Sequence, residues 1–136
     1  MSARFLQVAA IMTTLTLAAC GKPGVETLRT SFAQQVASNH FIRDFQRNAE
    51  DLIFSGPGVE VDDATWRIHI DSAVIEPNDD EALPYKGIIK SSWYANGQVI
   101  RPSGRDSNLP IELMANGLSQ DCCAFWNKTT GQWDWE

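Results

Sequence analysis

Residues 65–75 read TWRIHIDSAVI, a run in which apolar and polar side chains alternate. One side of the run carries Trp66, Ile68, Ile70 and Val74. The other side carries Arg67, His69 and Asp71. Because successive side chains of a β-strand point to opposite faces, the alternation predicts a strand with one face in the core and the other in water.

Similar runs follow towards the end of the sequence. Residues 85–95 predict a second strand, and Asn96-Gly97 is a favoured two-residue hairpin turn. Ile89 and Trp93 share a face of that strand. Further strands are expected over 98–101, 109–113, 118–127 and 132–136, with turns at Asn116-Gly117 and at 128–131. Hairpin-linked strands of this kind predict an antiparallel meander.

A different spacing precedes the strands. Between residues 25 and 54 the apolar positions recur at steps of three and four, at Val25, Leu28, Phe32, Val36, Phe41, Phe45, Ala49 and Leu52. Such steps predict an amphipathic helix. One step of five, at Ser38-Asn39, leaves two alternatives: one kinked helix, or two helices of which the second is capped there. Residues 55–58, Ser-Gly-Pro-Gly, end the helical region.

A helical region followed by hairpin-linked strands predicts the α+β class, with the apolar stripe of the helix covering the apolar face of the sheet. In element order the chain is similar to cystatin-like and nuclear-transport-factor-like folds. A length of 136 residues, 43% hydrophobic, supports one domain, which we place at residues 25–136.

The first twenty residues have the layout of a secretory signal. Arg4 gives a positive start, residues 5–17 are uncharged and mostly apolar, and two small residues follow. The segment ends Leu17-Ala18-Ala19-Cys20, which resembles the lipobox of bacterial lipoproteins. The resemblance implies cleavage between Ala19 and Cys20, which removes residues 1–19, and attachment of diacylglycerol and a further acyl chain such as palmitate to Cys20.

Lipidation determines the predicted location. Several acyl chains on one residue hold a protein firmly on a bilayer, whereas one chain holds it only marginally. Residues 20–24 would form the lipidated tether, and Gly21, where inner-membrane lipoproteins of the enteric scheme carry Asp, favours the outer membrane. We therefore expect a protein of the bacterial cell envelope, anchored by lipid and facing the periplasm.

The charge of the chain bears on its partners. It has 11 Lys and Arg against 17 Asp and Glu, a formal net charge of −6, and loss of residues 1–19 with Arg4 makes this −7. Negative charge disfavours nucleic acid and anionic headgroups as partners. It is compatible either with simple solubility or with a basic partner; the oligomeric state is left open.

Three tryptophans lie in the last eleven residues, Trp126, Trp133 and Trp135. Trp133 and Trp135 share one face of the final predicted strand. If that face points inward, they belong to the core. If it is open, the three residues form an aromatic binding surface for a protein, a glycan or an extended peptide.

Cys122 and Cys123 are adjacent, and they are the thiols left once Cys20 is acylated. Three alternatives remain: one core thiol with one thiol on the opposite face, a vicinal redox pair, or a bridge to another chain. A vicinal disulfide is strained, since adjacent Cα atoms lie about 3.8 Å apart, below the usual disulfide range of roughly 4.4–6.8 Å.

Polar clusters give weaker indications. His69 shares its strand face with Asp71, a carboxylate that could orient the imidazole for catalysis, but alternating charge on a wet face is far commoner. The acidic residues 79–81, with Asp62 and Asp63, lack the ligand spacing of a calcium loop. We therefore expect no catalytic residues, no metal site and no cofactor besides the lipid.

The sequence thus favours a non-enzymatic binding or accessory module for an envelope protein. Two alternatives remain: a small-ligand domain with a Trp-lined pocket between helix and sheet, or an inhibitor or immunity protein acting on a basic, envelope-targeting enzyme.

Overall fold

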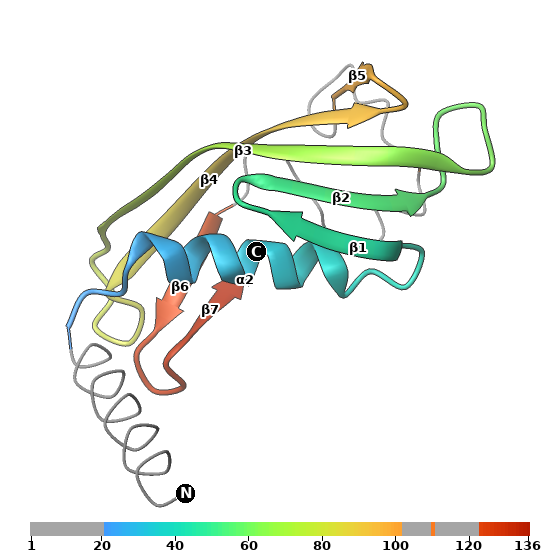
Figure 1. Cartoon of the computed structure of the whole chain (residues 1–136). Coiled ribbons are helices and arrows are strands. Elements are labelled where there is room, and N and C mark those ends of the chain that lie inside the picture. The colour runs from blue at the N-terminus through green and yellow to red at the C-terminus, as the bar shows by residue number, and fades with distance from the viewer. Residues whose placement is uncertain (1–20, 102–109, 111–122) are drawn as a thin grey trace, which may run out of the picture.

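The computed structural model describes residues 21–101, 110 and 123–136 and places one helix against one antiparallel sheet (Figure 1). Helix α2 spans Val25–Ala37. The strands are β1 (Arg43–Asn48), β2 (Asp51–Gly56), β3 (Ala64–Pro77), β4 (Tyr85–Ala95), β5 (Gln98–Ile100), β6 (Cys123–Asn127) and β7 (Gln132–Trp135). No helix in this part of the chain is long and apolar enough to cross a membrane.

The strands run in the order β1-β2-β3-β4-β6-β7, and every neighbouring pair is antiparallel. Strand β5 pairs with the end of β4, beside Trp93, and β6 pairs with its beginning, beside Tyr85. The sheet curls round α2 as a half-barrel, with β1 along one flank of the helix and β6 and β7 along the other (Figure 1). The predicted α+β class is confirmed, and the layout is compatible with the cystatin-like and nuclear-transport-factor-like arrangement.

The core lies between the helix and the concave face of the sheet. From α2 it takes Leu28, Phe32, Ala33 and Val36; from the sheet it takes mainly Leu52, Phe54, Trp66, Ile68, Ile70, Ile89, Trp93 and Trp133. The predicted inward positions Trp66, Ile68 and Ile70 are therefore confirmed. Each large side chain buried in this way stabilises the fold by about 1.5–3 kcal/mol.

The buried indoles satisfy their N–H groups within the core. Trp66 Nε1 donates to the carbonyl oxygen of Pro57 at 3.0 Å, and Trp93 Nε1 donates to Ser91 Oγ at 2.8 Å. The Trp66 ring stacks on Phe54 and meets the Trp93 ring edge-on. Because a buried donor without a partner costs free energy, these bonds allow two tryptophans to sit at the centre of a small core.

The prediction that residues 25–54 are helical is wrong beyond Ala37. Ser38 caps the C-terminus of α2, and the buried Asn39 accepts a hydrogen bond from the Phe41 N–H at 2.9 Å, which turns the chain. Residues 43–56 then form the β1–β2 hairpin. Neither the kinked helix nor the second helix is found, because six residues of β2 pair with β3 and bury Leu52 and Phe54.

Strand β3 departs from simple alternation at a bulge between Ile70 and Ser72. The extra residue shifts the following side chains to the other face. Val74, which the sequence places on the same side as Trp66, is therefore exposed, and Ile75 is buried in its place.

The two predicted turns that lie within the described residues are confirmed. Asn96 and Gly97 both have positive φ angles, 49° and 80°, as a two-residue hairpin turn requires, and residues 128–131 turn between β6 and β7. The predicted strand at 109–113 and turn at 116–117 lie outside the described residues, apart from Pro110.

Candidate functional site

A groove opens between α2 and the β6–β7 hairpin, with a volume of about 540 Å³. The helix side is lined mainly by hydroxyl and amide side chains, those of Thr27, Thr30, Ser31, Gln34, Gln35 and Ser38. The sheet side is lined by Trp126, Gly131, Gln132, Trp133 and Trp135. The groove thus has an aromatic wall facing a polar one, an arrangement that suits a ligand with both apolar and hydrogen-bonding groups.

Two hydrogen bonds fix the aromatic wall to the helix. Trp133 Nε1 donates to Thr27 Oγ1 at 3.2 Å, and Trp135 Nε1 donates to Ser31 Oγ at 2.8 Å. Residues four apart on a helix lie about 6 Å apart along its axis, and residues two apart on a strand about 6.6 Å. The two periods match, so α2 and β7 run alongside each other in the same direction.

The three tryptophans are not equally accessible. Trp126 and Trp133 are 9% and 7% exposed and meet edge-to-face with ring centroids 5.3 Å apart. Trp135 is half-buried, with its ring centroid 5.7 Å from that of Phe32. The final strand therefore points its tryptophans inward, against the helix. In place of an open patch of three rings, Trp135 supplies most of the exposed aromatic surface.

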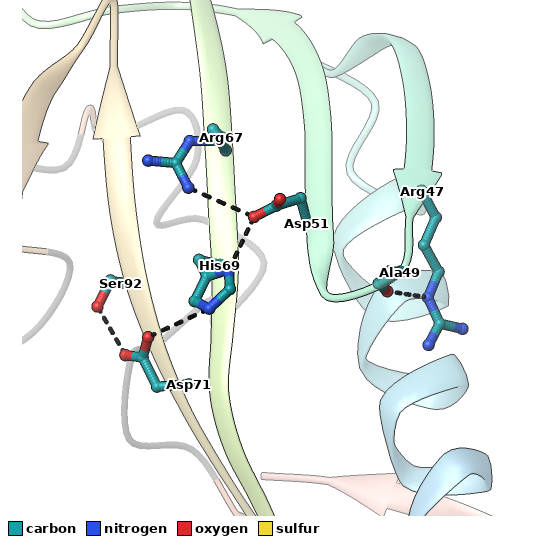
Figure 2. A network of polar contacts seen from close by, with 7 residues as sticks. All are labelled: Arg47, Ala49, Asp51, Arg67, His69, Asp71 and Ser92. Atoms are coloured by element: carbon teal, nitrogen blue, oxygen red, sulfur yellow. Dashed lines mark hydrogen bonds and ion pairs between the residues drawn. The ribbon is translucent and has the colours of Figure 1, made fainter.

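A second polar cluster lies on the sheet face away from the core, and Figure 2 shows its contacts. His69 Nδ1 lies 2.8 Å from Asp51 Oδ1, and Arg67 approaches the same oxygen at 3.4 Å. On the other side of the ring, His69 Nε2 is 4.0 Å from Asp71, which accepts a hydrogen bond from Ser92 at 2.6 Å.

The sequence alternation predicts Asp71 as the carboxylate beside His69, but in the structure Asp51 lies nearer to the imidazole. The reason is the sheet register: Asp51 of β2 stands directly opposite His69 of β3. A bond of this kind depends on tertiary pairing, and a single strand's alternation carries no signal for it.

The Asp51 carboxyl is in contact with both His69 and Arg67. The hydrogen bond from His69, helped by Arg67, lowers the pKa of the Asp51 carboxyl. Arg67 also lies over the Tyr94 ring, 4.3 Å from its centroid. Ser92 donates its hydroxyl hydrogen to Asp71 and not to His69. In a nucleophile–base pair the serine hydroxyl would instead be hydrogen-bonded to the imidazole, so the described contacts are those of a surface ion-pair network.

The cysteine predictions remain predictions. Cys123 begins β6 and is half-buried, whereas Cys122 and Cys20 lie outside the described residues. Within the described part of the chain, no three His, Cys, Asp or Glu side chains come together as a metal site.

The polar wall of the groove is the part that sequence reasoning missed. Thr27 and Ser31 stand four residues apart on the helix, and Trp133 and Trp135 stand two apart on the strand. The matched spacing is visible in the sequence, but only the fold shows that these two elements are neighbours. Comparison with protein families, with curated proteins and with solved structures finds no match to this chain.

Proposed function

We propose that this chain is a lipid-anchored lipoprotein of the bacterial envelope that binds a protein partner, without catalysis, in the groove between α2 and β7. Two independent features support the proposal. The lipobox-like segment ending at Cys20 supports the anchor. The groove supports the binding role.

The groove is the observation on which the binding role rests. Its volume of about 540 Å³ is within the range of roughly 300–1,000 Å³ that is usual for ligand sites. In this proposal α2 is the amphipathic element of the fold. Its apolar residues Leu28, Phe32 and Val36 face the core, and its hydroxyl and amide groups face the groove.

The anchor would place this groove close to the membrane. Val25, the first residue of α2, follows Cys20 by five positions, and five extended residues span at most about 18 Å. Glu26 and Thr27, at the same end of the helix, line the groove. A lipidated Cys20 would therefore hold the groove near the periplasmic surface of the bilayer, where membrane-associated partners are concentrated.

A small ligand is the second candidate occupant, and the composition of the groove favours it in one respect. An aromatic wall facing hydroxyl and amide groups can bind a compact molecule with one apolar face and several hydroxyl groups. In that case the groove holds the molecule itself and no protein partner contacts it.

Site-specific crosslinking in intact cells tests the binding role. A photo-crosslinking residue is placed at Gln35, which lines the groove, and in a separate variant at Lys90, which is exposed on β4 away from the groove. We expect a protein adduct from position 35 and none from position 90. Adducts of equal yield from both positions, or none from either, would refute a protein-binding groove.

A further inference from the structure

Strand β7 is the last strand of the sheet in the part of the chain that the structure describes. In the described part of the sheet it has a single neighbour, β6, and it ends the strand order. The Glu136 N–H donates to the carbonyl oxygen of Cys123 at 3.2 Å. Hydrogen-bonded pairs alternate along an antiparallel ladder, so Asp134 and Gln132 also face β6 with their main-chain groups. The N–H and C=O groups of Trp133 and Trp135 therefore point away from β6, to the side of β7 where no described strand lies.

The opposite edge of the sheet, β1, is protected against pairing. It carries a bulge between Arg43 and Gln46, and Asp44 within it has a positive φ of 55°. Arg47 ties β1 to the helix by hydrogen bonds to Thr30 and Glu26. Bulges and charged side chains are the usual devices that stop an edge strand from pairing with another chain. Strand β7, with the sequence Gln-Trp-Asp-Trp, has no bulge, and its one charged residue is the exposed acid Asp134, which disfavours an acidic strand and leaves the edge open to a basic one.

The charges around β7 favour a basic occupant. Asp134 and Glu136 are the charged residues of the edge segment, and both are exposed acids. Among the described residues that line the groove, none is Lys or Arg, and the whole chain carries a formal charge of −6. On the other face of β7, the partly exposed ring of Trp135 adds an aromatic surface to the groove.

We propose that β7 binds an extended, basic segment of the partner as an additional β-strand, held by the main-chain groups of Trp133 and Trp135. Alternate side chains of that segment enter the groove against Trp135 and the polar side of α2. Main-chain hydrogen bonds supply affinity in this mode of recognition, and the pocket for alternate side chains supplies specificity. This inference rests on the proposed protein-binding function and names how the partner is held.

Amide exchange tests the inference on the intact protein in detergent. The probe is the capped peptide Lys-Thr-Lys-Thr-Lys-Thr, with Glu-Thr-Glu-Thr-Glu-Thr as its acidic counterpart. At saturation by the basic peptide, we expect hydrogen exchange of the Trp133 and Trp135 amides to slow at least about tenfold, because they gain hydrogen-bond acceptors. The Asp134 amide, already directed to β6, should change little. Unchanged exchange at Trp133 and Trp135 would refute strand addition.

Two charge variants distinguish the effect of a charge on β7 itself from the effect of the protein's net charge on peptide binding. Asp134→Lys places a basic residue on β7, and Asp62→Lys makes the same change of charge in the loop before β3. We expect Asp134→Lys to weaken binding of the basic peptide by about tenfold or more, and Asp62→Lys by less than about threefold. Equal weakening by both variants, or equal binding of the acidic and basic peptides, would overturn the basic-edge assignment.

The outcomes also separate this inference from the proposed function. A protein adduct from position 35 without protection of the Trp133 and Trp135 amides would refute strand addition and leave the groove as a protein-binding site. Absence of that adduct would refute the proposed function itself. Binding of the trisaccharide of N-acetylglucosamine in the groove, without amide protection, would overturn the strand proposal in favour of a sugar ligand.

Discussion

Gly87 of β4 lies where Leu28 of the helix packs tightly on the sheet, and its replacement by alanine tests the packing that forms the groove. A Cβ at this position would lie 2.6 and 2.9 Å from the two terminal carbons of Leu28 and 2.9 Å from Cζ3 of Trp133. Real side chains do not approach so closely, so one neighbour must move. Leu28 is fully buried and Trp133 is a rigid ring bonded to the helix, so neither moves freely.

The expected cost is that of an overpacked core. Inserting a methyl group into a packed interior costs about 1–3 kcal/mol. Against this, alanine in the middle of a strand gains about 0.5–1 kcal/mol over glycine through chain entropy. From the middles of these two ranges, we expect Gly87→Ala to lower the free energy of unfolding by about 1 kcal/mol. For a small protein this moves the urea midpoint by about 0.5 M.

The assay is urea unfolding of the purified chain, followed by tryptophan fluorescence and circular dichroism. Gly21→Ala is the control, because a Cβ there meets nothing within 4 Å. In the Gly87→Ala background, Leu28→Ala should cost at least about 0.5 kcal/mol less than it does alone, since the two changes share one space. A Gly87→Ala protein as stable as wild type, or additive effects of the two substitutions, would refute the close packing of α2 on β4.

Three further changes test the anchor, the groove and the outer cluster. Cys20→Ala should move the protein from the membrane to the soluble fraction, as followed by fractionation and immunoblotting; continued membrane retention would contradict the lipid anchor. Thr27→Val removes the acceptor of the Trp133 indole and the donor to the Gly24 carbonyl, and should cost about 0.5–1.5 kcal/mol in urea unfolding. The same change should cost less in a Trp133→Phe background, because one of the two bonds is already lost there; an equal cost in both backgrounds would contradict the contact. The lowered pKa of Asp51 means that its ionised form stabilises the fold above about pH 4, and that this contribution is lost as the pH falls through the lowered folded value. Stability of Asp51→Asn should therefore fall less steeply than that of wild type below about pH 4, and parallel pH profiles would contradict the role of the bond to His69.

Strand β3 shows which side-chain positions can be predicted from the local alternation of the sequence and which cannot. Trp66, Ile68 and Ile70 are buried as the alternation predicts, because a half-buried strand needs only its own period of two to assign its faces. The same reasoning fails at Val74, since the bulge after Ile70 arises from pairing with β4 and leaves no mark in the strand's own sequence. The Asn96-Gly97 turn could be predicted because its backbone angles demand those residue types.

The β1–β2 hairpin is a part of the fold that the local sequence pattern predicts wrongly. Its turn residue Ala49 has a positive φ of 55° without the glycine or asparagine that usually signals such a turn. Phe45 and Leu52 also fit the helical spacing, so the local pattern favours a helix. Pairing of β2 with β3 decides the outcome, because it satisfies a full row of main-chain groups and buries Phe54 against Trp66.

The sequence alone determined the α+β class, the inward face of the central strands and the lipobox-like segment, because each depends on residues close together along the chain. The groove depended on the tertiary structure. It exists because the curled sheet brings β7, more than a hundred residues later, alongside α2, where Thr27 and Ser31 accept the indole hydrogens of Trp133 and Trp135. Contacts between such distant residues follow from how the strands are ordered, and that order is a property of the whole fold.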